Sequence, residues 1–186
     1  MITNLHERIV EASPEACWSL IERLGTPLDR FWPHHRWSPI HLEGPLAQGT
    51  LGGHGPLRYE VEQVVPRQVA RFRFNCPYGA TGHHSFEVTP CGEGRTRLAH
   101  RLEMTASLPA VFSWYTGLKF LHDALMEDAL DCAQQALEPL TTLERRPLPF
   151  HIRALRAFGS RRLRAFRPLD ITPEELEAEL FNPSLR

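Results

Sequence analysis

The chain has 186 residues, of which 42% are hydrophobic and 23% are charged, with a formal net charge of -1. This composition is typical of a soluble globular domain with a sizeable core. No stretch is apolar for long enough to cross a bilayer, and the start, MITNLHERIVEAS, lacks the features of a secretory signal. We therefore expect a cytoplasmic protein. The four cysteines form no CxxC pair, so we expect free thiols.

Charge divides the chain into two parts. Residues 1–138 carry 12 basic and 16 acidic side chains, whereas residues 139–186 carry 9 basic and 6 acidic ones. Residues 145–167 hold eight arginines and no acid. We interpret residues 1–139 as one ligand-binding domain and residues 140–186 as a helical tail, basic and then acidic.

The first predicted elements are a strand over residues 4–11 and a helix that begins at Ser13-Pro14. Serine suits the N-cap and proline the first helical position. Gly25 suits the end of this helix, and residues 26–35 form a loop or a short helix. In residues 36–56, Gly52 and Gly53 indicate a bulge or bend among short strands. The buried helix face is predicted to comprise Cys17, Leu20, Ile21 and Leu24.

A hairpin is predicted around the turn at Pro66-Arg67. Folding the chain there places Val61 opposite Phe72 and Tyr59 opposite Phe74. The other face then pairs Glu60 with Arg73 and Glu62 with Arg71. One register therefore yields an apolar face and two opposite-charge pairs.

A second hairpin is predicted from residues 83–89 and 95–105, with its turn centred on Gly92. This register places Val88 opposite Thr96, Phe86 opposite Leu98, and His84 opposite His100. Glu87 falls opposite Arg97 on the charged face. Both histidines therefore lie on the inner, mainly apolar face.

Helical periodicity returns over residues 110–138. Apolar side chains recur there at spacings of three and four, which predicts one long helix that ends before Pro139. Residues 147–168 resemble a basic amphipathic helix broken at Gly159-Ser160. Thr172 to Glu175 form a capping box that opens a short acidic helix. The long helix is predicted to bury Trp114, Leu118, Leu121, Leu125, Ala129, Cys132 and Ala136.

Three segments resemble the START/Bet v 1-like (SRPBCC) superfamily, which includes bacterial polyketide cyclase/dehydrase-like and lipid-transport-like proteins. They are HERIVEASPEACWSLI, GHHSFEVTPCGEGRTRLAHRLEM and the helix from Trp114 to Leu137. The resemblance covers residues 3–138. It implies an α+β helix-grip fold, in which a curved antiparallel sheet wraps around a long C-terminal helix.

The same resemblance implies a cavity between sheet and helix that holds a small apolar molecule such as a lipid or polyketide. Three functions remain open: a binding module, a cofactor-free cyclase or dehydratase that uses pocket histidines, and an interaction protein that acts through its basic tail. The expected ligand-binding residues are Tyr59, Phe72, Phe74, His84, Phe86, Leu98, His100, Leu102, Leu118, Leu121 and His122.

His84 and His100 are the most informative of these residues. A buried neutral imidazole needs a partner for each ring nitrogen. The two rings could bond to each other or to water, anchor a ligand, or transfer a proton. His122-Asp123 could supply polar groups to the cavity, although we expect Asp123 at the surface. Trp32 and Trp37 could pack the early helices or gate the cavity.

Other site chemistries have little support in the sequence. No HExxH motif, Cys/His cluster, GxSxG elbow, P-loop or GxGxxG motif occurs, so we expect no metal and no cofactor. The arginines of residues 145–167 could dock on the domain, or they could contact an anionic membrane or an acidic protein. Nucleic-acid binding is not expected, because the body of the chain is acidic and its aromatic residues follow the core pattern.

Overall fold

The computed structural model of the chain describes residues 1–55, 57–76, 79–140 and 147–163. Its strands are β1 (Ile2–Val10), β2 (Ile40–Leu42), β3 (Leu51–His54), β4 (Leu57–Val65), β5 (Val69–Cys76), β6 (Ala80–Pro90) and β7 (Thr96–Ala106). Its helices are α1 (Pro14–Ile21), α2 (Leu108–Ser113), the π-helical segment η1 (Trp114–Leu118), α3 (Lys119–Leu137) and α4 (Phe150–Leu163).

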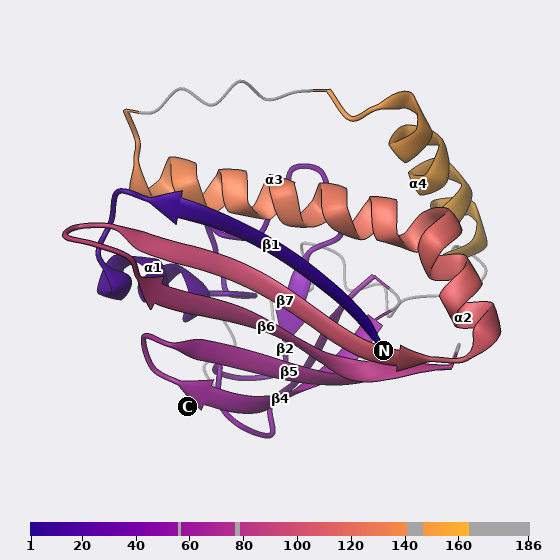
Figure 1. Cartoon of the computed structure of the whole chain (residues 1–186), viewed down its shortest axis with the longest axis horizontal. Coiled ribbons are helices and arrows are strands. Elements are labelled where there is room, and N and C mark those ends of the chain that lie inside the picture. Colours follow the sequence, from indigo (N-terminus) through magenta and orange to yellow (C-terminus); the bar gives the residue numbers. More distant parts are fainter. Residues whose placement is uncertain (56, 77–78, 141–146, 164–186) are drawn as a thin grey trace, which may run out of the picture.

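The seven strands form one antiparallel sheet in the order β1-β7-β6-β5-β4-β3-β2. The sheet curves, and α3 lies along its concave side next to the edge strand β1 (Figure 1). This is the predicted α+β helix-grip fold. All four cysteines are free. Within the described ranges, no helix combines the length and apolar character that crossing a bilayer requires.

The β4–β5 hairpin confirms most of its predicted register. Val61 pairs with Phe72, Tyr59 with Phe74, and Glu60 with Arg73. The predicted pairing of Glu62 with Arg71 is wrong, because the register shifts after Val61 and Gln63 takes that place. Such a bulge adds one residue to a strand and re-aims the side chains beside it. Glu62 lies instead 2.7 Å from His83 Nδ1 on β6.

The β6–β7 hairpin has a different register from the predicted one. Phe86 pairs with His100, and His84 with Leu102. Pro90 and Thr96 form the last pair, so the loop is centred one residue later than Gly92 and every partner moves by two.

A shift of two residues leaves the side chains on their predicted faces, because the strand period is two. His84 and His100 therefore both point inward, as diagonal neighbours rather than directly opposite each other. Glu87 lies opposite Ala99 instead of Arg97. Its carboxylate forms an ion pair with Arg101 at 3.2 Å.

The N-terminal half follows the predicted order. Ser13 caps α1 by accepting a hydrogen bond from Ala16 N at 3.2 Å, and the helix buries Cys17, Leu20 and Ile21. Residues 36–56 contain the short strands β2 and β3. A Cβ at Gly52 would lie 2.5 Å from the His41 carbonyl oxygen, so the close approach of these two strands requires glycine there.

The long helical region is continuous but not uniform. Between α2 and α3, η1 forms a π-helical turn in which the Lys119 N–H bonds to the Trp114 carbonyl oxygen. A π turn contains an extra residue per hydrogen-bonded loop and so changes the phase of the side chains. Trp114 is buried as predicted, whereas Leu118 is 52% exposed.

Helix α4 belongs to the predicted tail and contacts α3. It buries Ile152, and Arg156 lies over the ring of Trp37 at 4.6 Å. The predicted break at Gly159-Ser160 is wrong, because α4 continues to Leu163. The predicted capping box and acidic helix lie outside the described residues.

The loop between α1 and β2 contributes to the core through Phe31. This ring is 1% exposed and makes an edge contact with Phe86, with 5.0 Å between ring centroids.

Replacing Phe31 with alanine should lower the free energy of unfolding by about 3–5 kcal/mol, because the surrounding residues cannot fully fill the cavity that the ring leaves. Urea denaturation measures this loss. Phe112→Ala is the control, since Phe112 is 70% exposed; an equal loss in both variants would contradict this packing.

Candidate functional site

A line of buried rings runs across the concave face of the sheet toward α3. His84 stacks on Phe72, with 4.9 Å between centroids and 13° between planes. The His84 and His100 centroids lie 5.5 Å apart, and those of His100 and His122 lie 5.1 Å apart. The histidines of β6, β7 and α3 are therefore consecutive neighbours.

The line extends in both directions. On one side the Tyr59 ring lies 5.0 Å from His84, and His54 lies 5.9 Å from Tyr59. On the other side His6 of β1 lies 5.9 Å from His122. We call these six residues the ring line; they are His6, His54, Tyr59, His84, His100 and His122.

The structure brings most of the predicted ligand-binding residues together. Leu118 is the exception, because the phase change in η1 leaves it exposed, and we exclude it from the site. Phe74, Leu121 and His122 are half-buried. The buried members are Tyr59, Phe72, His84, Phe86, Leu98, His100 and Leu102.

Sequence reasoning missed both ends of the ring line. His54 follows two glycines in a segment without a clear strand pattern, so its inward direction had no signal. His6 alternates with exposed residues along β1 and could have been assigned to the face of Asn4 and Val10. His122 was among the predicted residues, but its contact with His6 could not be deduced, because the two residues lie on a strand and a helix at opposite ends of the domain's sequence.

Four polar atoms of the ring line are shielded from solvent and have no hydrogen-bond partner among the residues that the structure describes. They are Nδ1 of His54, the hydroxyl of Tyr59, and Nδ1 of His100 and of His122. Leaving one such atom unpaired costs about 1–3 kcal/mol, so native proteins rarely do so. All four lie in one connected line of ring contacts.

Burial keeps four imidazoles of the ring line neutral, those of His54, His84, His100 and His122. It lowers the pKa of His54 to about 4, and the nearby Arg58 charge adds to that shift. It also lowers the pKa of His84 to about 3, with contributions from His54, His122 and His83. For His100 the pKa lies well below its usual value for the same reason. Near neutral pH, each ring therefore offers one donor and one acceptor but no charge.

The ring line separates two parts of the apolar core. The larger part includes Phe72, Phe86 and most of the buried face of α3. The smaller one consists of Ile2, Leu102, Met104 and Trp114. His84 contacts Phe72 of the first and pairs along the sheet with Leu102 of the second. At the α3 side, His122 lies 5.5 Å from Trp114.

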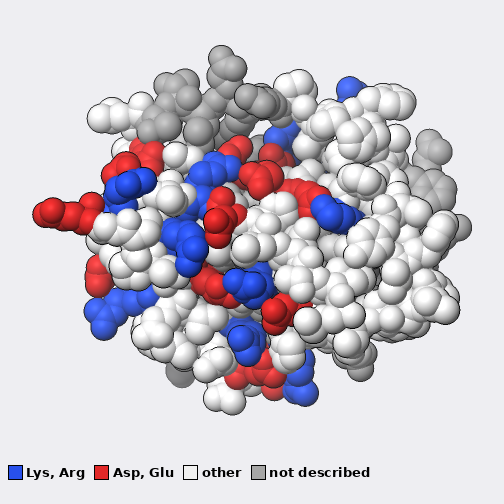
Figure 2. Space-filling view, in the orientation of Figure 1, with Lys and Arg blue, Asp and Glu red and all other residues white. Residues whose placement is uncertain are grey.

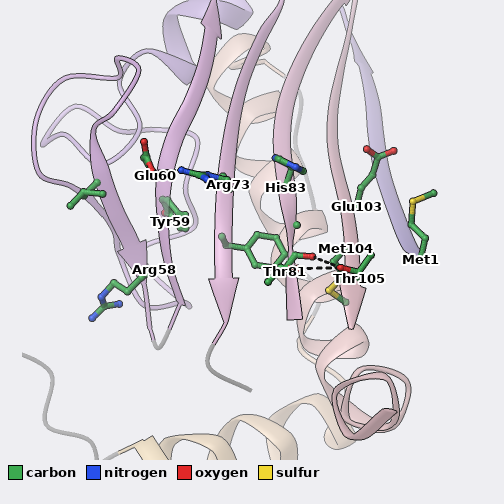
Figure 3. Close-up of a pocket in the computed structure, with 13 residues that line it drawn as sticks. Met1, Arg58, Tyr59, Glu60, Arg73, Thr81, His83, Glu103, Met104 and Thr105 are labelled. Atoms are coloured by element: carbon green, nitrogen blue, oxygen red, sulfur yellow. Dashed lines mark hydrogen bonds and ion pairs between the residues drawn. The ribbon is translucent and has the colours of Figure 1, made fainter. Parts of the chain in front are cut away.

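Two surface hollows lie on the outer side of the sheet. The larger, of about 760 Å³, is lined by both charged and apolar side chains, among them Glu60, Arg73, Glu103 and Met104 (Figure 3). The other, of about 730 Å³, lies beside Pro14 and Arg67. Neither is the apolar cavity between sheet and helix that the resemblance implies.

Trp32 and Trp37 pack the early loop onto the domain. Trp32 is buried, donates to the Ser38 carbonyl oxygen at 2.8 Å, and lies 4.9 Å from the His54 ring. The indole N–H of Trp37 donates to Asp128 of α3 at 2.7 Å. These contacts support the packing interpretation of both residues.

Comparisons with known proteins bear on the fold. No protein-family model matches the chain, and no curated protein sequence matches it. Solved structures do match. The crystal structure of CalU16 from Micromonospora echinospora is 15% identical, with 86% of this chain and 84% of that one covered and a TM-score of 0.55.

Two further solved structures match the fold of this chain. A protein from Thermobifida fusca is 15% identical, covering 79% of this chain and 100% of its own, with a TM-score of 0.61. Norcoclaurine synthase from Thalictrum flavum is 14% identical, covering 76% and 90%, with a TM-score of 0.58. These neighbours confirm the predicted SRPBCC resemblance at the level of fold.

The lowered pKa of His84 predicts how stability depends on pH. Between pH 6.5 and 3 the His84 imidazole is protonated in the unfolded chain but stays neutral in the native protein. The free energy of unfolding therefore falls as the pH falls. Each such histidine contributes a slope of up to about 1.4 kcal/mol per pH unit. His84→Phe should reduce the slope between pH 6.5 and 4.5, as measured by urea denaturation.

The matched control for this experiment is His41→Phe, because His41 is exposed on β2. It should leave the slope unchanged. If His84→Phe also leaves it unchanged, His84 is not buried as a neutral ring.

Proposed function

We propose that this protein binds a small, largely apolar molecule with a hydroxyl or carbonyl group, held between the concave face of the sheet and α3. The observation that carries this proposal is the set of four unpaired polar atoms along the ring line. A polar group of the ligand would satisfy these atoms, and ordered water would do so when no ligand is bound.

The type of polar group follows from the protonation of the ring line. Neutral imidazoles and a neutral phenol donate and accept hydrogen bonds without charge. Burial also raises the pKa of Tyr59, which keeps its hydroxyl protonated. A ligand with a charged group would lose its hydration without gaining a counter-charge there, so hydroxyl and carbonyl groups fit best.

The side chains around the ring line are apolar, which indicates a ligand with an apolar body. Phe72 and Phe86 are almost fully buried, whereas Leu102, Met104 and Trp114 keep 5–7% of their surface accessible. The smaller part of the core also lies next to half-buried Phe74 and His122. This is where an aromatic or aliphatic guest would lie.

The proposed entrance is the α2–η1 end of the domain. Figure 2 shows this end of the molecule almost free of charged side chains. Apolar residues are exposed here, including Leu108, Phe112 and Tyr115. The π-helical turn of η1 places Trp114 between this surface and His122, and π turns occur frequently at functional sites.

One structural neighbour supports the chemistry of the ligand. The norcoclaurine synthase structure is described as a complex with dopamine and hydroxybenzaldehyde. Of the two, hydroxybenzaldehyde is an uncharged aromatic ring that carries a hydroxyl and a carbonyl group, whereas dopamine also carries an amine. A phenolic compound would likewise combine an apolar body with the donors and acceptors that the ring line requires.

Binding is favoured over acid–base catalysis as the role of the histidines. A general base works best when its pKa is close to the operating pH. With a pKa lowered to about 3, His84 and His122 are weak bases near neutrality. They are better suited to orient a ligand than to remove its proton.

The proposal predicts that 2-naphthol binds more tightly than naphthalene, which has the same apolar body without the hydroxyl. One added hydrogen bond in a buried site should strengthen binding roughly tenfold. Titration calorimetry of both compounds measures the ratio. His100→Phe and Tyr59→Phe should each reduce this preference while leaving naphthalene affinity largely intact.

Tyr115→Phe is the matched control, because Tyr115 is 56% exposed, and it should keep the preference. Absence of binding by both compounds, or a preference that survives both His100→Phe and Tyr59→Phe, would contradict the proposal.

A further inference from the structure

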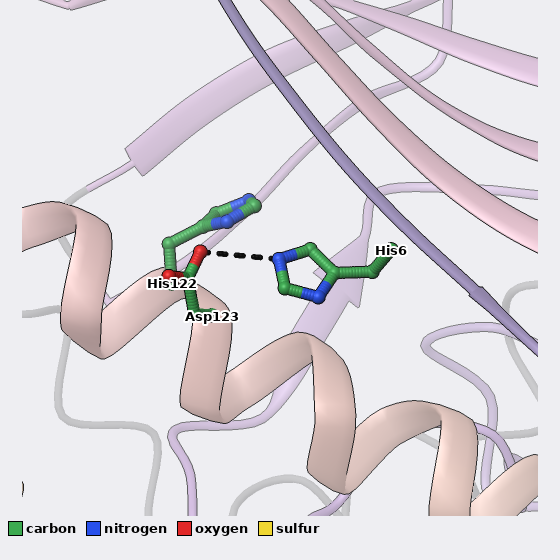
Figure 4. A group of neighbouring side chains, drawn as sticks. All are labelled: His6, His122 and Asp123. Atoms are coloured by element: carbon green, nitrogen blue, oxygen red, sulfur yellow. Dashed lines mark hydrogen bonds and ion pairs between the residues drawn. The ribbon is translucent and has the colours of Figure 1, made fainter.

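A polar seam joins the edge strand β1 to α3. The side chain of His6 lies between two carboxylates of α3: its Nε2 is 3.1 Å from Asp123 Oδ1, and its Nδ1 is 2.8 Å from Glu127 Oε1. His122, the residue before Asp123, lies on the inner side of the same turn. Figure 4 shows the three side chains of His6, His122 and Asp123 converging from strand and helix.

The three groups have the composition and spacing of a metal site. One ligand atom from each of His6, His122 and Asp123 lies within 4.8 Å of the other two. Around a tetrahedral zinc ion, with bonds of about 2.1 Å, ligand atoms lie about 3.4 Å apart. Small side-chain rotations would therefore bring the three atoms to coordination distance.

Surrounding groups orient these ligands as in known metal centres. A histidine that binds a metal usually donates its other ring N–H to a carboxylate, and Glu127 occupies that place on His6 Nδ1. Asn4 donates to Asp123 Oδ1 at 2.9 Å, and Lys119 binds Asp123 Oδ2 at 2.5 Å. The carboxylate is therefore fixed, with Oδ1 directed toward His6.

His122 supplies an independent observation. Its Nδ1 is shielded from solvent and has no hydrogen-bond partner in the described part of the chain, which is unfavourable unless something binds there. We propose that His6, His122 and Asp123 bind a divalent first-row transition metal ion. Two imidazoles and one carboxylate are a ligand set used for zinc and for non-haem iron(II) when further positions stay open.

This site could not be predicted from the sequence, which indicated no metal. His6 and His122 are separated by 116 positions, and no short motif joins them. They meet only because β1 pairs with β7 and lies along α3. The metal proposal shares one observation with the proposed function, the unpaired Nδ1 of His122. Its other arguments, the distances among His6, Asp123 and Glu127, do not involve the apolar ligand.

The test is binding of Zn²⁺ and Co²⁺ to the full-length protein. Equilibrium dialysis with metal analysis should give one ion per chain, and the visible absorption of bound Co²⁺ should report a coordination number of four or five. His6→Gln, His122→Phe and Asp123→Asn should each weaken binding by more than about a hundredfold. Glu127→Gln, which alters an orienting group, should weaken it by about 10–100-fold.

His83→Gln is the matched control. His83 lies on the outer face with Glu62 as its carboxylate partner, so it tests whether any histidine–carboxylate pair binds metal. Circular dichroism confirms that each variant is folded. No stoichiometric binding by the unaltered protein, or equal binding by the three ligand variants and the His83 variant, would overturn the proposal.

Discussion

The site depends on one constraint: successive side chains along β6 and β7 point to opposite faces of the sheet. This alternation directs His84, Phe86, His100 and Leu102 toward α3, on the same buried face as Phe72 of β5. Burial keeps these imidazoles neutral, and neutral rings can only be satisfied by hydrogen bonds. A core made of apolar residues alone would need no guest. The polar atoms that interrupt this core are the basis of the proposed ligand site.

The β1–α3 seam complements this inner wall. Arg8 binds Asp131 at 2.7 Å and Glu127 at 3.0 Å, which extends the contacts of His6 along the helix. Single exposed ion pairs contribute little. In this series the carboxylates of Glu127 and Asp131 are about half exposed, whereas the side chains of His6 and Arg8 are largely covered, and the contacts join α3 to the sheet edge. The seam thus positions His122 at the junction of two features, the ring line and the proposed metal site.

The sequence predicted the fold well because alternation and helix periodicity are local properties. The inward direction of Tyr59, Phe72, His84 and His100 follows from period two, and it survived a register error of two residues in the β6–β7 hairpin. That error came from the position of the loop centre, which composition does not specify.

The remaining differences have non-local or subtle causes. The bulge after Val61 and the π turn at Trp114 each change the phase of the side chains that follow, so Glu62 and Leu118 lie elsewhere than predicted. His6 and His54 were not assigned because their neighbours come from distant strands and from α3. Local patterns therefore identified the centre of the ring line, whereas its ends required the tertiary structure.

A crystal structure of the gently purified protein at high resolution tests the central claim most directly. We expect ordered density, from water or from a retained ligand, within about 2.7–3.2 Å of His100 Nδ1 and the Tyr59 hydroxyl. Rings that instead turn to bond each other or the backbone, in an interior filled by side chains, would contradict the account.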